Sequence, residues 1–114
     1  GAKAVHGLGI TQVVPYPFGA NKAAVREYQT LLQKYGGGQA PSYTSFEEFL
    51  GAKMQVEGLR RAGPAPTRAK LTKALESMDN FDLGGTRVQY SATNRQGSKF
   101  VEVTVIGANG KLLR

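Results

Sequence analysis

The sequence predicts a small α/β fold in which three helices are flanked by short strands at both ends of the chain. Three observations support this: apolar residues recur at helical spacing through the middle, β-branched apolar runs lie near both ends, and glycine- or proline-rich turns separate the segments. A length of 114 residues allows one modest core, and 40% hydrophobic content argues against disorder.

Composition and charge exclude some classes of protein. The chain has no cysteine, which excludes disulfides and thiolate metal sites, and neither a membrane-spanning apolar run nor a signal peptide is expected in it. Its net charge of +7 makes nucleic acid a partner to consider. The cations are spread over expected solvent faces without a recognised binding motif, so we favour a solvated surface and keep a free-standing basic α/β module that binds nucleic acid as an alternative.

The first strand is expected at residues 8–14, LGITQVV, as a short buried strand. It is followed by Pro15–Gly19, where two prolines prevent both a central strand and an early helix start, so this segment should be a rigid connector. The connector carries Tyr16 and Phe18. Either these rings pack under the neighbouring helix, or one of them faces a ligand.

The first helix is expected between Asn21, a favourable N-cap, and the triple glycine at residues 36–38. In the second helix, Ser45 and Glu48 match a capping box. Its apolar positions share one stripe at helical spacing: Phe46, Phe49, Ala52, Val56 and Leu59. Gly63–Pro64 should end it.

The third helix should begin after Thr67 as the N-cap. It is expected to bury a stripe of four residues: Leu71, Ala74, Leu75 and Met78. A turn at Gly84–Gly85 then leads into a half-exposed strand at residues 86–91.

The strongest strand pattern covers residues 99–106, with Val101, Val103 and Val105 on one face. A turn at residues 94–97 precedes this segment. Asn109–Gly110 matches the hairpin dipeptide, which predicts a short return strand at residues 111–113.

Catalytic constellations are not found in the sequence. His6 is the only histidine and lies near the terminus. Glu47 and Glu48 are adjacent, so on a helix they point about 100° apart, and the first-turn dipole explains them. Turn chemistry explains Asp79 and Asp82. We therefore expect no catalytic residue, metal site or cofactor, and a small enzyme is the least favoured hypothesis.

A series of motifs runs in order over nearly the whole chain: GITQVVPYPF, VREYQTLLQKYG, SFEEFLGAKMQVEGLRRAG, TRAKLTKALESMDNFDLGG, TRVQYS, NRQGS and FVEVTVIGANGKL. Each motif alone is weak, whereas their order and spacing together are specific. With them, the chain resembles the C-terminal third of type I periplasmic solute-binding proteins of ABC transporters, the leucine/isoleucine/valine-binding family.

The resemblance implies a fragment of a two-lobed fold, joined by three crossings, that closes around a small ligand. Residues 1–14 would be a strand of the second lobe, residues 15–91 the helical part of the first lobe, and residues 92–114 the return to the second lobe with a C-terminal hairpin. The N-terminal part, which carries most ligand contacts in the family, would be missing. We expect such a fragment to self-associate through exposed strand edges and helix faces.

The resemblance also implies a function. The parent protein would be a periplasmic receptor that binds a branched-chain or aromatic amino acid, or a related carboxylate, and delivers it to a membrane permease. The residues expected nearest to the ligand are Tyr16, Phe18, Ser45 and Phe46. The chain departs from the family at Glu48–Phe49, where relatives often carry Gly-Tyr, so a hydrogen bond from that tyrosine cannot form here.

Overall fold

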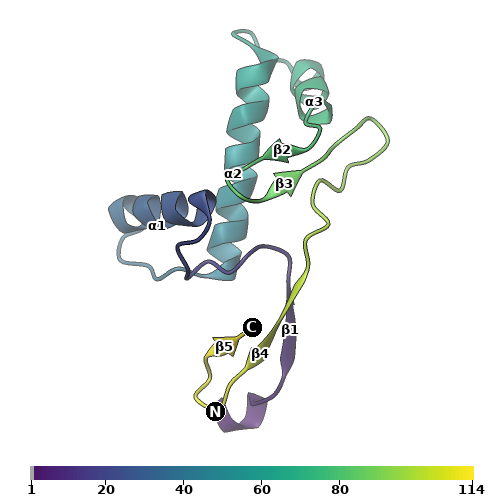
Figure 1. The fold of residues 1–114 in the computed structure, drawn as a ribbon. Coiled ribbons are helices and arrows are strands. Elements are labelled where there is room, and N and C mark those ends of the chain that lie inside the picture. The colour runs from purple at the N-terminus through teal and green to yellow at the C-terminus, as the bar shows by residue number, and fades with distance from the viewer. Residues whose placement is uncertain (1) are drawn as a thin grey trace. The chain divides into compact units, whose positions relative to one another are not determined.

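The structure is a computed structural model that describes residues 2–114 (Figure 1). It contains, in order, a 3-10 helix Ala2–Val5, β1 Gly9–Gln12, α1 Ala23–Tyr35, α2 Tyr43–Ala62, α3 Arg68–Glu76, β2 Phe81–Asp82, β3 Arg87–Val88, β4 Glu102–Ile106 and β5 Leu112–Leu113. The predicted α/β class, with three helices between strands at the two ends of the chain, is confirmed. Within residues 2–114, no helix combines the length and apolar character needed to cross a membrane.

The chain divides into two compact units. Unit 1 consists of the residues up to Pro15 together with Lys99–Arg114, and unit 2 consists of Tyr16–Ser98. The chain therefore passes between the units twice, once beside Pro15 and once beside Ser98.

Unit 1 is a three-stranded antiparallel sheet in the order β1-β4-β5. The predicted turn at Asn109–Gly110 is confirmed, because it joins β4 to β5 and Gly110 adopts a φ of +77°. Gly107 donates its amide to the Lys111 carbonyl at 2.8 Å, which closes the turn. Local turn chemistry was sufficient to place this hairpin.

The predicted burial of the first strand is wrong, and the valine face of the strongest strand is exposed. The residues of β1 are exposed or half-exposed, and Val103 of β4 is 58% exposed, with Val101 and Val105 also exposed on its face. Thr104 on the opposite face is buried, and its hydroxyl donates to the Ile10 carbonyl at 3.1 Å. Alternation shows which residues share a face, but not which face other elements cover.

Unit 2 contains all three helices and the β2–β3 pair. Its core is formed by apolar side chains from every one of these helices and from the β2–β3 segment: Ala24, Val25, Tyr28, Phe46, Leu50, Ala74, Met78, Leu83 and Val88. Gly58 permits close packing of α3 on α2, because a Cβ at this position would lie 2.8 Å from Leu75 Cδ2. The third helix ends at Glu76, so Met78 is buried just beyond it.

The predicted capping box of α2 is wrong. Ser42 is the N-cap, and its hydroxyl accepts a hydrogen bond from the Ser45 amide at 3.1 Å. The helix therefore begins three residues earlier than expected, and Glu47 and Glu48 lie in its second turn rather than its first. Ser42 has the extended backbone of an N-cap residue, whereas Ser45 already lies within the helix.

The predicted apolar stripe of α2 is only partly buried. Phe46 is buried, but the other fully covered positions are Leu50 and Gly58, while Val56 is 66% exposed and Leu59 is exposed. The covered face is thus rotated toward the residues that meet α1 and α3. A broad apolar stripe in the sequence does not determine which of its residues lie at the middle of the buried face.

The other two helix starts gave one wrong and one confirmed prediction. Lys22, not Asn21, occupies the N-cap of α1 and makes no side-chain cap; the Ala24 amide instead donates to the Gly84 carbonyl at 2.9 Å. Thr67 caps α3 as predicted by accepting from the Lys70 amide at 3.2 Å. The predicted end of α1 at the triple glycine is also confirmed.

The β2–β3 hairpin is shorter than the predicted strand at residues 86–91, and its first strand was not predicted. Gly84 and Gly85 have φ angles of +109° and +94°, which only glycine adopts readily. Asp82 accepts hydrogen bonds from both glycine amides, at 2.8 and 2.6 Å. These bonds, with that from Gly85 the stronger cause, hold the pKa of the Asp82 carboxyl below its usual value.

Candidate functional site

Three aromatic rings meet where the connector reaches the start of α2. We call Tyr16, Phe18 and Tyr43 the aromatic cluster. The ring centroids of Tyr16 and Phe18 are 5.2 Å apart, and Tyr43 lies 6.5 and 6.0 Å from them, all edge to face. Phe18 is 45% exposed, so the cluster presents an aromatic surface rather than a closed core.

The connector that carries two of these rings is held against α1. Gln29 on α1 donates its side-chain amide to the carbonyls of Pro17 and Gly19, at 2.8 and 3.0 Å. Proline fixes φ, so the backbone here has few alternatives. The positions of Tyr16 and Phe18 are therefore set by the connector and α1 together.

A hydroxyl network lies beside the cluster at the same end of α2. The Ser45 hydroxyl lies 2.5 Å from the Tyr28 hydroxyl and 2.8 Å from that of Ser42. The Ser42 amide donates to the Tyr28 oxygen at 3.0 Å. α2 has no acidic residue in its first turn, so the positive end of the helix dipole is not neutralised there by its own carboxylates.

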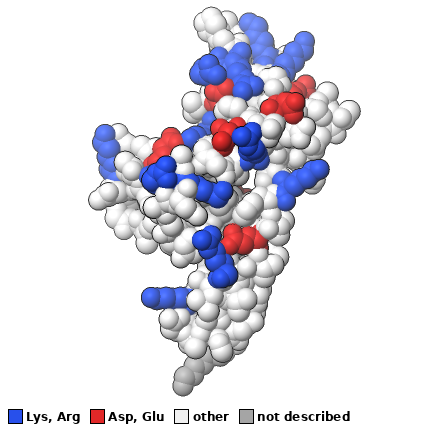
Figure 2. Space-filling view, in the orientation of Figure 1, with Lys and Arg blue, Asp and Glu red and all other residues white. Residues whose placement is uncertain are grey.

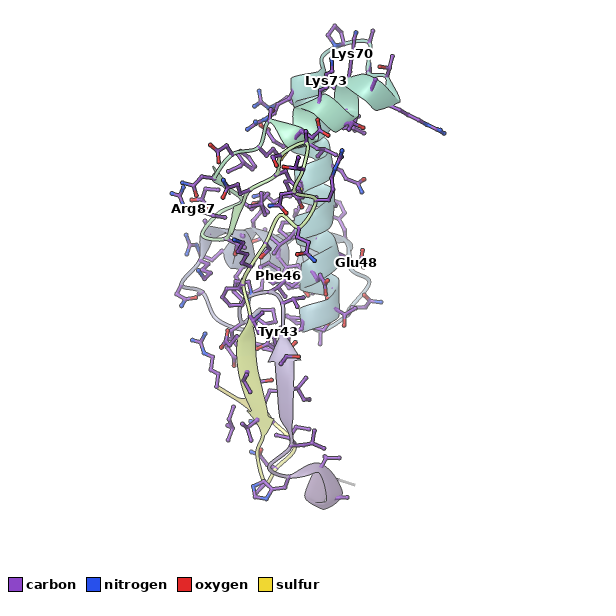
Figure 3. The ribbon with its side chains drawn as sticks, turned by 90° about the vertical axis from the view of Figure 1, so that its right-hand side faces the viewer. Tyr43, Phe46, Glu48, Lys70, Lys73 and Arg87 are labelled. Atoms are coloured by element: carbon purple, nitrogen blue, oxygen red, sulfur yellow. The ribbon has the colours of Figure 1, made fainter. Side chains whose placement is uncertain are left out.

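The four residues predicted to contact a ligand differ in their position and burial. Tyr16 and Phe18 are brought together in the aromatic cluster, and Ser45 lies in the adjacent hydroxyl network. Phe46 is fully buried and packs on Tyr28, with ring centroids 5.1 Å apart. Figure 3 shows Phe46 and Tyr43 near the same end of α2.

Sequence reasoning missed two members of this region, Tyr28 and Tyr43. Tyr43 follows Ser42 directly, so choosing Ser42 as the cap would have placed its ring at the start of α2. Tyr28 sits in an ordinary apolar stripe of α1, and nothing local distinguishes its hydroxyl from that of any core tyrosine.

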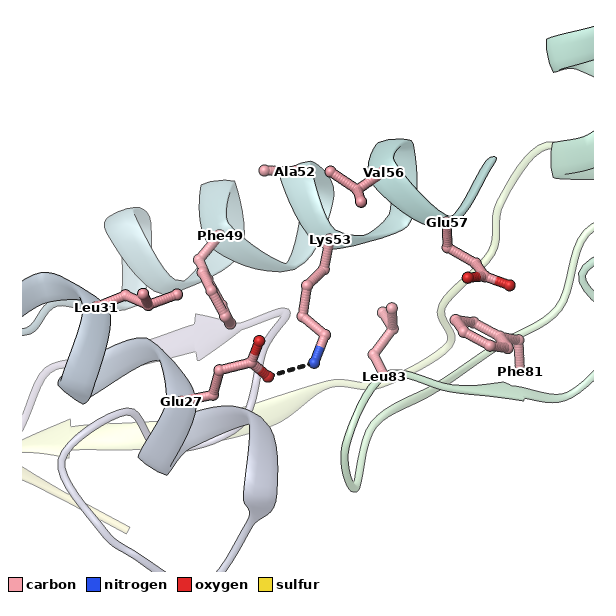
Figure 4. Close-up of a pocket in the computed structure, with 9 residues that line it drawn as sticks. All are labelled: Glu27, Leu31, Phe49, Ala52, Lys53, Val56, Glu57, Phe81 and Leu83. Atoms are coloured by element: carbon pink, nitrogen blue, oxygen red, sulfur yellow. Dashed lines mark hydrogen bonds and ion pairs between the residues drawn. The ribbon is translucent and has the colours of Figure 1, made fainter. Parts of the chain in front are cut away.

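Unit 2 also contains an apolar groove of about 520 Å³ between α1, α2 and β2 (Figure 4). It is lined by Glu27, Leu31, Phe49, Ala52, Lys53, Val56, Glu57, Phe81 and Leu83. Its size suits a small molecule. However, Lys53 and Glu27 form an ion pair at 2.5 Å across it, so these charged groups already satisfy each other.

Glu57, at one end of this groove, is bound by two arginines. Arg60 Nε and Arg61 Nε lie 2.8 and 2.7 Å from its carboxylate oxygens. The hydrogen bond from Arg60, followed by that from Arg61, lowers the pKa of Glu57 to about 2. A carboxylate this acidic and fully paired is suited to holding structure together rather than to accepting a proton near neutral pH.

The chemistry offered by the site is that of binding. Aromatic faces, hydroxyls and a helix N-terminus can hold a small apolar or carboxylate-bearing molecule. Across residues 2–114, no group of three or more His, Cys, Asp or Glu side chains is placed to hold a metal ion.

Comparison with known proteins decides the family. The family model for periplasmic binding proteins matches residues 1–111. The chain belongs to the periplasmic binding protein family. The predicted resemblance is thereby confirmed, and the family is one of binding proteins rather than enzymes. No curated protein matched the chain.

Solved structures of this family resemble the chain over almost all of its length. A substrate-binding periplasmic protein from Ralstonia solanacearum is 32% identical, with a TM-score of 0.87 over 98% of this chain and 32% of that one. A possible leucine/isoleucine/valine-binding protein from Rhodopirellula baltica is 26% identical, with a TM-score of 0.87 over 98% of this chain and 31% of that one. An extracellular ligand-binding receptor from Verminephrobacter eiseniae is 26% identical, with a TM-score of 0.81 over 99% and 32%. The chain therefore spans about a third of the length of these relatives.

Proposed function

We propose that this chain forms part of the substrate-binding receptor of an ABC transporter, which takes up a small solute in the periplasm and passes it to a membrane permease. The observation that carries the proposal is the half-exposed aromatic cluster at the start of α2, in a chain of the periplasmic binding protein family. The solute would be a branched-chain or aromatic amino acid, or a related carboxylate. Similarity to the Rhodopirellula protein, a possible leucine/isoleucine/valine-binding protein, supports this class.

Each part of such a solute has a suitable counterpart in unit 2. The ring faces of Tyr16, Phe18 and Tyr43 would pack on the apolar side chain of the solute. The first turn of α2 would attract its carboxylate through unneutralised amide dipoles. Ser45 would donate a hydrogen bond, and Phe46 would support the rings from below.

The mechanism would be closure of two lobes around the solute. We assign residues 1–14 and 92–114 to one lobe and residues 15–91 to the other. The division of the structure into two units beside Pro15 and Ser98 supports two separate lobes, although it groups residues 92–98 with the helices. Contacts from both lobes would favour the closed state by population shift.

The proposal can be tested with a chimera in which this chain replaces the matching third of the Rhodopirellula protein. Isothermal titration calorimetry would measure binding of leucine, valine, phenylalanine and acetate to the chimera and to this chain alone. We expect the chimera to bind at least one of the amino acids, and the chain alone to bind weakly or not at all, because one side of a cleft buries little of a ligand. A folded chimera that binds none of them would contradict the proposed solute class.

Single substitutions in the chimera would test the residues. Phe18→Ala should weaken binding by about tenfold or more, since an aromatic contact and its buried area contribute on the order of 1–2 kcal/mol. Ser45→Ala should weaken it less. Leu59→Ala, in the later turns of α2, 46% exposed and outside the apolar groove, is the matched control and should leave the affinity unchanged. Equal effects of Phe18→Ala and Leu59→Ala would exclude a specific role for the aromatic cluster.

A further inference from the structure

The strongest concentration of positive charge lies at the end of unit 2 formed by the last turns of α2, the connecting loop and α3. The segment 57–76 contains five Lys and Arg against two Glu, a net charge of +3 within twenty residues. We call its cations the cationic end: Arg60, Arg61, Arg68, Lys70 and Lys73. Figure 2 shows Lys and Arg side chains gathered over this part of the molecule.

The two carboxylates of this segment offset only part of its charge. Glu57 is largely buried and is held by Arg60 and Arg61, and the half-buried Glu76 is paired with Arg95 at 2.6 Å. All five cations of the cationic end are exposed. The Lys73 ammonium makes no ion pair or side-chain hydrogen bond within residues 2–114, whereas Lys70 Nζ donates to the Ala65 carbonyl at 3.1 Å. The outward field of this end is therefore positive.

An apolar tip lies between the cations. The loop from α2 to α3 carries Pro64, Ala65 and Pro66, all exposed, with arginines before it and Arg68 after it. On one side, a shallow groove of about 480 Å³ is lined by Lys70 and other residues of α2 and α3. Exposed apolar residues flanked by Lys and Arg are the pattern by which proteins rest on an anionic bilayer surface.

We propose that the cationic end is a membrane-docking surface that binds the phosphate headgroups of anionic phospholipids. Its cations would lie against the headgroups, while the Pro64–Pro66 tip would reach the boundary of the acyl chains. A bilayer is favoured over nucleic acid because the tip is apolar and residues 57–76 include no aromatic side chain on which bases could stack. The Phe81 ring is the aromatic partner of Arg61, whose guanidinium lies over it at 4.9 Å from the centroid.

The surface is separate from the proposed solute site. Figure 3 places Lys70 and Lys73 at one end of unit 2, and Tyr43 and Phe46 at the other end of α2. The inference rests on the proposed function in one respect only: a receptor that serves a membrane permease has to approach a bilayer. Solute binding and lipid binding can therefore be measured, and can fail, independently.

The test is flotation of the 114-residue chain with vesicles on a density gradient, where bound protein rises and any aggregate sinks. Vesicles of phosphatidylcholine with phosphatidylglycerol should carry the chain upward at low ionic strength, and raised salt should reverse this. Vesicles of phosphatidylcholine alone should not carry it. Equal flotation with both kinds of vesicle, or none with either, would overturn the proposal.

Variants separate a specific surface from overall charge. Lys70→Gln/Lys73→Gln should weaken vesicle binding by about tenfold or more, because each cation near an anionic surface contributes a factor of roughly five. The control Lys99→Gln/Lys111→Gln removes the same charge from unit 1 and should leave binding nearly unchanged. Equal losses in the two variants would overturn the assignment to the cationic end.

A duplex oligonucleotide in the same buffer provides the remaining comparison. Tighter binding of the oligonucleotide than of the anionic vesicles, lost in Lys70→Gln/Lys73→Gln, would overturn the membrane assignment in favour of nucleic acid. Weaker binding of the oligonucleotide would support it.

Discussion

The two units treat similar apolar residues in opposite ways. Unit 2 buries a core of aromatic and aliphatic side chains between three helices and a hairpin, although some, such as Val56, stay exposed. Unit 1 leaves most of its large aliphatic residues exposed: Val5, Leu8, Val13, Val101, Val103, Val105 and Leu113. The difference shows that burial depends on a second layer to pack against, not on the apolar pattern itself. Unit 2 has such layers among its own elements, whereas the described strands of unit 1 form a single sheet.

The largest difference should appear when core residues are truncated. Phe46→Ala in unit 2 should reduce the free energy of unfolding by about 3–5 kcal/mol, because a fully buried ring is lost. Chemical denaturation followed by the helical circular dichroism signal would measure this. Val103→Ala in unit 1 is the control and should change stability by less than about 0.5 kcal/mol. Comparable losses would mean that the valine face is covered in solution.

The β2–β3 turn should be the next most sensitive position. Gly84→Ala should destabilise unit 2 by about 1–3 kcal/mol, since it combines a φ of +109° with a Cβ only 2.8 Å from the Ala24 amide nitrogen. Gly37→Ala also has a positive φ, of +60°, but meets no atom within 4 Å. Chemical denaturation followed by circular dichroism should show a smaller loss for Gly37→Ala, and equal losses would exclude the Ala24 contact as a cause.

The Glu57 carboxylate should give unit 2 a distinct pH dependence. Its pKa is lowered from 4.5 to about 2, so its contribution is complete above about pH 4.5 and is lost as the pH falls toward 2. Glu57→Gln should cost on the order of 1 kcal/mol at pH 7, after allowance for solvent screening of the arginines. The difference between wild type and variant, measured by urea denaturation, should disappear toward pH 2. A difference that grows on acidification would contradict this.

Substitutions on the exposed valine face of unit 1 should change the stability least, but they should clearly change self-association of the chain. Val101→Thr/Val103→Thr keeps β-branched side chains and should alter the free energy of unfolding by about 0.5 kcal/mol or less. It should also reduce self-association measured by light scattering on dilution, because less apolar surface is offered to a second chain. The same substitution at Val56 of α2 tests whether the helical surface contributes instead. A wild-type chain that stays monomeric at high concentration would remove the basis for this expectation.

Much of the fold could be predicted because its signals are local. The glycines after α1, Thr67 before α3 and the Asn109–Gly110 hairpin each act within a few residues, and each is found where the sequence indicated. The errors concern long-range packing. Gly84 replaces a side-chain cap on α1, and the exposed face of β4 depends on which elements cover the sheet.

The candidate site was predictable to a similar degree. Two aromatics on a connector with two prolines indicated Tyr16 and Phe18, and the structure places their rings together. Their companion Tyr43 comes from another element, and the hydroxyl network depends on Tyr28 reaching Ser45 across the space between two helices. Neither of these contacts can be inferred from the spacing of residues along the chain.

The Gly84 carbonyl that receives the Ala24 amide belongs to a segment synthesised 60 residues after it. As the polypeptide leaves the ribosome, α1 and α2 therefore emerge before the group that completes the first turn of α1 exists. During translation the beginning of α1 should remain frayed until the β2–β3 hairpin has been synthesised. The first turn of α1 is therefore made early but becomes stable late.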